Sequence, residues 1–118
     1  SECGAIRAAV TGQVPQSSAH LTHWVQQLKE GRDISEEKLT PGLSHLNLVS
    51  QASVIRQLDN LRSSPMVQDR LADKKLTLHG WWFDIGNLDV YSFSDGKQRY
   101  ELMDEAYLSQ MLSSGQAR

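Results

Sequence analysis

The run LTLHGWWFDI at residues 76–85 limits what this chain can fold into more than any other stretch. Apolar and aromatic residues occupy successive positions in it, which is typical of a β-strand buried on both faces. Gly86 and Asn87 then predict a turn, DVYSF alternates as a second strand, and QRYELM predicts a third short strand. A doubly buried strand needs neighbours on its edges, so the rest of the chain decides what kind of sheet is possible.

The first two thirds of the chain carry helical patterns and no strand pattern. Helices are expected there over residues 4–10, 20–31, 46–63 and 65–75, and a terminal helix is expected over residues 104–114. The segment 46–63 has the strongest pattern and predicts one long helix, with Gln51 outside its buried face. In the next helix Met66 is expected to point inward, and Pro65 separates the two.

Two or three strands among five helices make a poor sheet by themselves. We therefore predict an α/β fold in which helices flank a mainly parallel sheet, with residues 75–94 forming a strand and hairpin at its edge. The chain is expected to supply the C-terminal half of that fold: long helix, strand, β-hairpin and terminal helix. All 118 residues are assigned to one domain, because a chain of this length has room for only one.

Composition excludes several classes of partner. Twelve Lys and Arg residues against fourteen Asp and Glu give a net charge of −2 without a long basic patch, so no nucleic acid is expected. Apolar runs are only a few residues long, so no membrane is expected either. A single cysteine cannot form an internal disulfide, and this favours a cytoplasmic location.

The four histidines do not make a catalytic or metal site that the sequence can identify. His20 and His23 are spaced i, i+3 on one helix, but no third ligand is evident, so surface positions are favoured. His45 has no acidic or thiol partner nearby in the sequence. His79 lies within the predicted strand, where a structural role with satisfied ring nitrogens is favoured over general-base chemistry.

Cys3 is the only cysteine, and it lies directly before an expected helix. A stray free thiol is the simplest interpretation. The start of a helix nevertheless stabilises a thiolate through the helix dipole and unpaired N–H groups, and the thiolate is the form that zinc binds. Cys3 is therefore either reactive or a metal ligand, and a ligand would need companions that this chain does not evidently provide.

Three segments resemble the β-class carbonic anhydrases, in the family's order, over residues 1 to about 100. SECGAIRAA is similar to the zinc-binding segment G-H-S-x-C-G-A, and SVIRQLDNLRSSPMVQDRL to the long helix that continues as N-L-x-x-x-P-x-V. KLTLHGWWFDIGNLDVYSF resembles the strand and hairpin L-x-L-H-G-W-x-Y-D-I. The matching positions are Ser1, Cys3, Gly4, Ala5, Val54, Gln57, Asn60, Leu61, Pro65, Val67, Leu76, Leu78, His79, Gly80, Trp81, Asp84 and Ile85.

The resemblance implies a role for Cys3. In this family Zn²⁺ is held by two cysteines and one histidine, and Cys3 matches the last of these ligands. The other two ligands, and the family's catalytic Asp-Arg pair, would lie upstream of Ser1, so no catalytic residue is assigned within this chain. Gly4 and Ala5 are expected near the metal, where their N–H groups could hydrogen-bond to the ligand sulfurs. His79 is not a zinc ligand in the family.

Phe83 stands where many members have a tyrosine. Some members use that tyrosine in a non-catalytic, inhibitory bicarbonate pocket, so its replacement puts this regulation in doubt.

The implied activity is the reversible hydration of carbon dioxide to bicarbonate by zinc-bound hydroxide, in a homodimer or larger homo-oligomer. The 118-residue chain alone, with one ligand of three, is expected to be inactive. The alternative is a truncated or degenerate homologue that serves as a non-catalytic assembly or partner-binding module.

Overall fold

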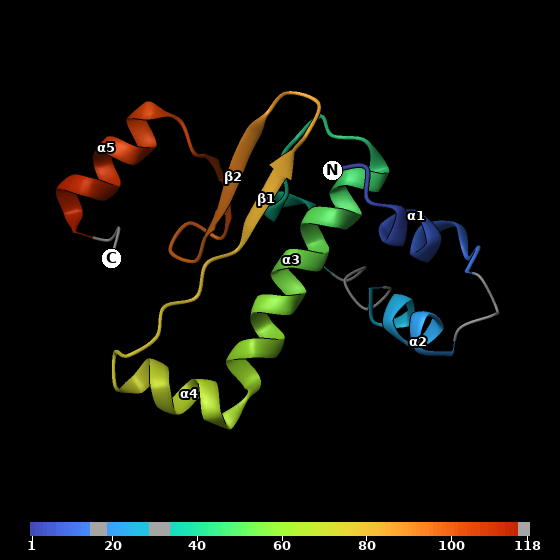
Figure 1. The fold of residues 1–118 in the computed structure, drawn as a ribbon. Helices are drawn as coiled ribbons and strands as arrows, with labels where there is room; N and C mark the ends of the chain where they lie inside the picture. Colours follow the sequence, from blue (N-terminus) through green and yellow to red (C-terminus); the bar gives the residue numbers. More distant parts are fainter. Residues whose placement is uncertain (15–18, 29–33, 116–118) are drawn as a thin grey trace.

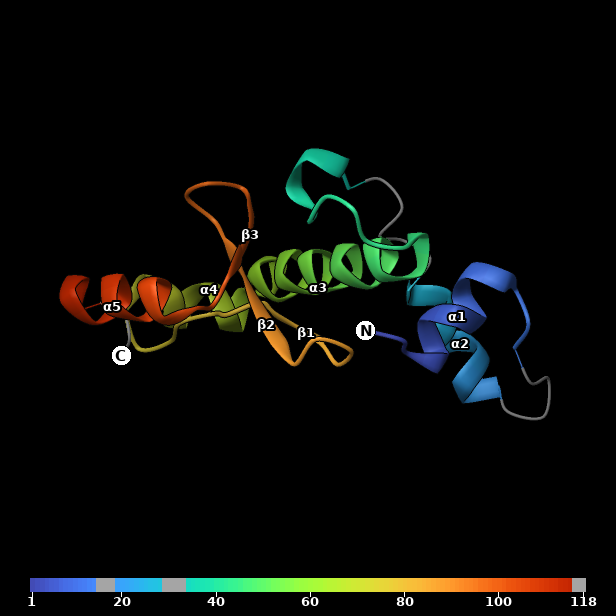
Figure 2. The same cartoon turned by 90° about the horizontal axis from the view of Figure 1, so that it is seen from above.

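A computed structural model describes residues 1–14, 19–28 and 34–115 (Figure 1). Its elements in chain order are α1 (Gly4–Thr11), α2 (Ala19–Leu28), the 3₁₀ turn η2 (Glu36–Lys38), α3 (His45–Ser63), α4 (Pro65–Ala72), β1 (Trp81–Asp84), β2 (Asp89–Ser94), β3 (Arg99–Leu102) and α5 (Glu105–Ser114). The single long helix expected over 46–63 is confirmed as α3. It lies at the centre, with α1 and α2 beside its N-terminal end and α4 at its C-terminal end (Figures 1 and 2).

Local signals explain where the main helices begin and end. The Ser44 hydroxyl accepts a hydrogen bond from the Asn47 backbone N–H at 3.3 Å and caps α3, whereas Pro65 at the first turn of α4 starts the next helix. The Asp104 carboxylate caps α5 in the same way, accepting from the Tyr107 N–H at 2.8 Å. Gly12 ends α1 at a φ of 74°, in the left-handed region that glycine adopts without strain.

The three strands form an antiparallel meander in the order β1-β2-β3. Trp82 pairs with Tyr91 between β1 and β2, and Phe93 pairs with Tyr100 between β2 and β3. The mainly parallel sheet that we expected is not found among the described residues, where both strand pairs are antiparallel. The coarser prediction, helices together with a small sheet and a hairpin, is confirmed.

The first strand is shorter than predicted. β1 begins at Trp81, whereas residues 75–80 form no strand. The hydrogen bond from the Phe93 N–H to the Gly80 carbonyl, at 2.8 Å, is the rung next to this end of the β1–β2 ladder. β2 ends one residue further on, at Ser94, so the run before His79 has no partner strand within the described part of the chain.

The main core lies between α3 and one face of the sheet. Its buried residues come from α3, from all three strands and from the connection before α3: Leu39, Ala52, Ile55, Leu58, Trp82, Phe93 and Tyr100. The Trp82 indole N–H donates to the Ser50 hydroxyl at 3.0 Å, which satisfies the polar atom of a buried ring. A smaller cluster of Ile6, Ala9 and Val25 joins α1 and α2.

Two side chains do not lie where the helical pattern put them. Gln51 was expected outside the buried face of α3, but it is 0% exposed. Its amide accepts from the Thr40 N–H and donates to the Thr40 hydroxyl, both at 2.9 Å, so burial leaves neither end unpaired. Met66 was expected to point inward, but it is 78% exposed, because no element packs over that side of α4 among the described residues.

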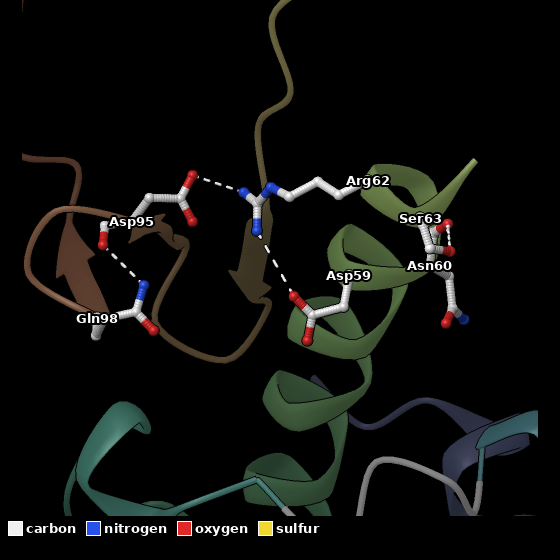
Figure 3. A network of polar contacts seen from close by, with 6 residues as sticks. All are labelled: Asp59, Asn60, Arg62, Ser63, Asp95 and Gln98. Carbon is white, nitrogen blue, oxygen red and sulfur yellow. Dashed lines mark hydrogen bonds and ion pairs between the residues drawn. The ribbon is translucent and has the colours of Figure 1, made fainter. Parts of the chain in front are cut away.

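Arg62 ties the C-terminal end of α3 to the turn between β2 and β3 (Figure 3). Its guanidinium lies 2.6 Å from the Asp95 carboxylate and 3.6 Å from that of Asp59. The Gln98 amide donates to the Asp95 carbonyl at 2.7 Å and closes the same turn. These groups are partly exposed, so the contact orients the hairpin more than it stabilises it.

The outer face of β1 is apolar and uncovered over much of its length. Trp81, Phe83 and Ile85 are 52%, 55% and 65% exposed, and they alternate with buried Trp82 and Asp84. The prediction of a strand buried on both faces is therefore wrong for the described residues, which bury only the face that carries Trp82 and Asp84. No helix among the described residues is long and apolar enough to span a membrane.

Candidate functional site

Cys3 lies at the N-cap of α1, where the sequence places it. Its backbone is extended, with φ −72° and ψ 125°, and its carbonyl accepts the first helical hydrogen bond, from the Arg7 N–H at 3.0 Å. The thiol is exposed and makes no capping hydrogen bond. Gly4 and Ala5 form the first turn, whose N–H groups have no partner within the helix. The thiol and these N–H groups are therefore available at one end of α1.

The segment before Cys3 is held against β1 and α3. The Ser1 backbone nitrogen donates to the Phe83 carbonyl at 2.6 Å, and the Ser1 hydroxyl accepts from the Ile85 N–H at 2.9 Å. The Glu2 N–H donates to the Asn47 side-chain oxygen at 3.3 Å. Cys3 is thus placed at the carboxyl end of β1, beside the N-terminal end of α3 (Figures 1 and 2).

The edge of β1 that meets Ser1 is the one not used by β2. Gly80 bonds to β2 through its carbonyl, so the backbone groups of Phe83 and Ile85, an odd number of residues away, point to the opposite edge. A residue of a parallel strand here would donate to the Phe83 carbonyl and accept from the Ile85 N–H. Ser1 does both, but it accepts with its hydroxyl instead of its carbonyl. One of its two hydrogen bonds, to the Phe83 carbonyl, is that of a parallel bridge, and we call this contact a half-bridge.

Phe83 and Asp84 lie at the same end of β1. The Phe83 ring is largely exposed and has no hydroxyl. The Asp84 carboxylate is buried and accepts from the Gly86 N–H at 3.1 Å, from the Asn87 N–H at 3.4 Å and from the Asn87 side-chain amide at 2.8 Å. These bonds close the turn between β1 and β2, so Asp84 has a structural role.

The histidines are spread over separate places. His20 and His23 are exposed on α2, where the His23 ring nitrogen lies 3.5 Å from the Gln27 side-chain amide, and His45 is exposed at the start of α3. His79 was expected within a buried strand. It is instead exposed and precedes β1, with its ring centroid 6.3 Å from that of Trp81. Its environment gives it no orienting carboxylate among the described contacts.

A cavity lies away from Cys3. About 750 Å³ in volume, it is bounded by β2, by the β2–β3 turn and by α5, with His79, Glu101, Tyr107 and Met111 among its lining residues. No residue of the Ser1–Cys3 segment and none from 80–85 lines it. The cavity does not identify the candidate site. We place that site at Cys3 because the thiol can bind a metal ion.

The donor set at that site consists of one thiol. No group of three or more His, Cys, Asp or Glu side chains in the described part of the chain could hold a metal ion. Zinc sites use three or four protein ligands. The described residues can therefore supply one ligand to a zinc site but cannot form a complete site. The contacts of Ser1 and Asn47 were not found from the sequence, because they join positions 45 to 84 residues apart.

Comparison with known proteins agrees with the resemblance. Residues 1–90 match the family described as carbonic anhydrase. Carbonic anhydrase 1 of Escherichia coli O157:H7 is 31% identical over 105 residues, covering 84% of this chain and 45% of that protein. Beta carbonic anhydrase 1 of Caenorhabditis elegans is 36% identical over 70 residues, covering 59% of this chain and 26% of that protein.

The fold agrees as well. The solved structure of the β-carbonic anhydrase CcaA superposes with a TM-score of 0.67 at 21% identity, covering 86% of this chain and 51% of that one. The chain thus spans about half or less of the length of these relatives. With a family match over three quarters of its residues, the chain belongs to the β-class carbonic anhydrase family.

Proposed function

We propose that the complete protein is a carbonic anhydrase, a lyase that interconverts carbon dioxide and bicarbonate, and that Cys3 is one of its zinc ligands. The observation that carries this proposal is the position of the only cysteine. In a chain of this family it lies exposed at a helix N-terminus, at the carboxyl end of β1.

The chain's own contribution is to hold one metal ligand and to surround it with hydrogen-bond donors. Zinc, when bound, would supply a water acidic enough to give hydroxide near neutral pH. The N–H groups of Gly4 and Ala5 are the donors nearest in sequence to the Cys3 sulfur, and hydrogen bonds from them would limit the charge that the sulfur places on the metal. The remaining ligands and the acid–base pair are supplied by residues that this sequence does not contain.

We also propose that β1 joins a parallel sheet in the complete protein. The half-bridge between Ser1 and the free edge of β1 has the direction of parallel pairing, and the apolar outer face of β1 fits a strand covered on both sides. A homodimer or larger homo-oligomer and a cytoplasmic location are further parts of this proposal. Phe83, which lacks the tyrosine hydroxyl, supports the absence of bicarbonate inhibition through that position.

The activity is tested by stopped-flow CO₂ hydration with added zinc. The 118-residue chain alone is expected to give no rate above buffer, because it has one ligand. The same chain joined to a segment that carries a family histidine and cysteine with C-x-D-x-R is expected to be active. Turnover by the chain alone would show that the ligand assignment is wrong, and an inactive joined protein with full zinc content would favour the non-catalytic module.

A further inference from the structure

The exposed thiol of Cys3 is attached to a backbone that is fixed on both sides, and this calls for an explanation. The two residues before Cys3 make three hydrogen bonds to residues more than 40 positions away. Ser1 makes two of them at the free edge of β1, and Glu2 makes the third, to α3.

We propose that Ser1 and Asn47 are positioning residues for Cys3. Ser1 ends the pairing with β1 at a defined point. Its hydroxyl takes the hydrogen bond of the Ile85 N–H, which the Ser1 carbonyl would take if pairing continued. The Ser1 carbonyl is therefore not needed for pairing with Ile85, and the backbone can turn away from β1 toward the start of α1.

Asn47 holds the turn that follows. Glu2 has a φ of 53°, in the left-handed region that is costly for a residue with a side chain. Its N–H donates to the Asn47 side-chain oxygen, and Asn47 is itself fixed in the first turn of α3 by the Ser44 cap. The ion pair between Glu2 and Arg7, at 3.1 Å, is exposed at both ends and adds little. The left-handed turn directs Cys3 into the N-cap position.

The consequence is that the Ser1 and Asn47 side chains fix the backbone position of Cys3, while its thiol remains free to bind. A metal ligand that is exposed but fixed at its backbone loses little entropy on binding, which is the advantage of preorganisation. This inference rests on the proposed role of Cys3 as a zinc ligand. Its structural part can be tested without metal.

The test compares amide hydrogen exchange by NMR in Ser1→Ala, Asn47→Ala and the wild-type chain. In Ser1→Ala the Ile85 amide loses its acceptor, and in Asn47→Ala the Glu2 amide loses its acceptor. Each amide should then exchange about 2- to 10-fold faster, as expected for the loss of one ordinary hydrogen bond. Ser1→Thr and Asn47→Asp retain an acceptor oxygen and should restore wild-type rates. Asn60→Ala, an exposed asparagine on the same helix, is the matched control and should change neither amide.

A second readout uses Co²⁺ in the protein that carries the complete ligand set. Ser1→Ala and Asn47→Ala should weaken Co²⁺ binding roughly 10- to 100-fold, as is usual for residues that orient a metal ligand, and should alter the thiolate-to-cobalt absorption band. The rescue variants should restore both. Unchanged exchange at Ile85 and Glu2, or unchanged Co²⁺ affinity in both alanine variants, would overturn the positioning role. If Cys3→Ser retains Co²⁺ with wild-type affinity and with the full wild-type intensity of the thiolate-to-cobalt band, the proposed function fails instead, whatever the exchange rates show.

Discussion

Cys3 and His79 are the two residues whose sequence contexts suggest chemistry, and they lie at opposite ends of β1. Cys3 is joined through Ser1 to Phe83 and Ile85 at the carboxyl end, whereas His79 precedes the strand at Trp81. Five residue steps separate His79 from Asp84, which is about 16 Å in an extended strand. One metal ion at Cys3 is therefore out of reach of the His79 ring, in agreement with the family pattern.

We predict that Cys3→Ser and His79→Ala separate these roles in the protein with its complete ligand set. Cys3→Ser should lose zinc, because a neutral hydroxyl is a far poorer ligand than a thiolate, and the loss should be several kcal/mol out of the roughly 10–16 kcal/mol that small zinc sites provide. His79→Ala should retain one zinc per chain. Atomic absorption measures both, and loss of zinc in His79→Ala with retention in Cys3→Ser would contradict the assignment.

The exposure of His79 also changes the expected effect on stability. A buried histidine would leave a cavity and an unpaired neighbour when replaced by alanine, but an exposed one should change the free energy of unfolding by no more than about 0.5 kcal/mol. Urea unfolding of His79→Ala measures this directly. A larger loss would mean that the ring is packed in a way that its exposure does not indicate.

Tyr100 gives the clearest dependence on pH. Burial raises the pKa of its phenol, and the hydroxyl donates to the Gln51 carbonyl at 2.8 Å. A raised pKa means that the folded state keeps the proton longer, so this contribution is complete below the unfolded value near 10 and is lost as the pH rises above it. Tyr100→Phe should cost about 0.5–1.5 kcal/mol at pH 7 and show a smaller decrease in stability between pH 9 and 11. Equal pH slopes in urea titrations would contradict this explanation.

At the scale of elements, the backbone at Gly80, directly before β1, lies close against α3. A Cβ on Gly80 would lie 2.5 Å from the Leu58 Cδ1 atom and 3.2 Å from the Val54 Cγ1 atom. Leu58 is itself buried in the main core, so it cannot move aside freely. The glycine of the L-x-L-H-G-W pattern therefore has a packing role that the sequence does not explain: it lets the strand lie against the helix.

We predict that Gly80→Ala destabilises the chain by about 1–3 kcal/mol, as overpacking in a filled core usually does. Gly96→Ala is the matched control, because a Cβ there meets no atom within 4 Å and the residue does not need a left-handed backbone. Gly96→Ala should be neutral within about 0.5 kcal/mol. Equal effects of the two substitutions on the urea midpoint would show that the α3–β1 approach is not tight.

The elements were predicted from sequence wherever the signals are local. The start of α3 at Ser44, the break at Pro65 and the hairpin of β2 follow from neighbouring residues, and all lie where expected within a few positions. The burial of Gln51 depends on Thr40, which comes from a connection whose path the sequence does not specify. The length of β1 depends on partner strands, and strand pairing is a non-local property.

At the scale of the whole molecule, the outer face of β1 departs from an ordinary surface. Trp81, Phe83 and Ile85 form an exposed apolar row on one face, and single exposed apolar residues are common whereas contiguous ones mark interfaces. In the described part of the chain nothing packs over this row. The chain alone should therefore associate with itself.

We predict that sedimentation velocity shows concentration-dependent association of the 118-residue chain, reduced in the double variant Trp81→Ser/Ile85→Ser. Removing two apolar side chains from the row should weaken association by roughly tenfold or more, given ~25 cal/mol for each Å² of apolar surface. Met66→Ser removes an even more exposed apolar side chain, from α4, and is the control. A wild-type chain that stays monomeric at all concentrations would contradict the prediction.

The hydrogen bond between Ser1 and Phe83 spans 82 positions, and this has a consequence for how the protein is made. On the ribosome, the segment with Cys3 is made before β1 and cannot dock on it until residues 83–85 have been synthesised. At roughly 5–20 residues per second, this leaves the thiol without its anchors for several seconds. During synthesis the backbone of this cysteine is therefore free to move, and it gains a fixed place only when the strand that orients it has been made.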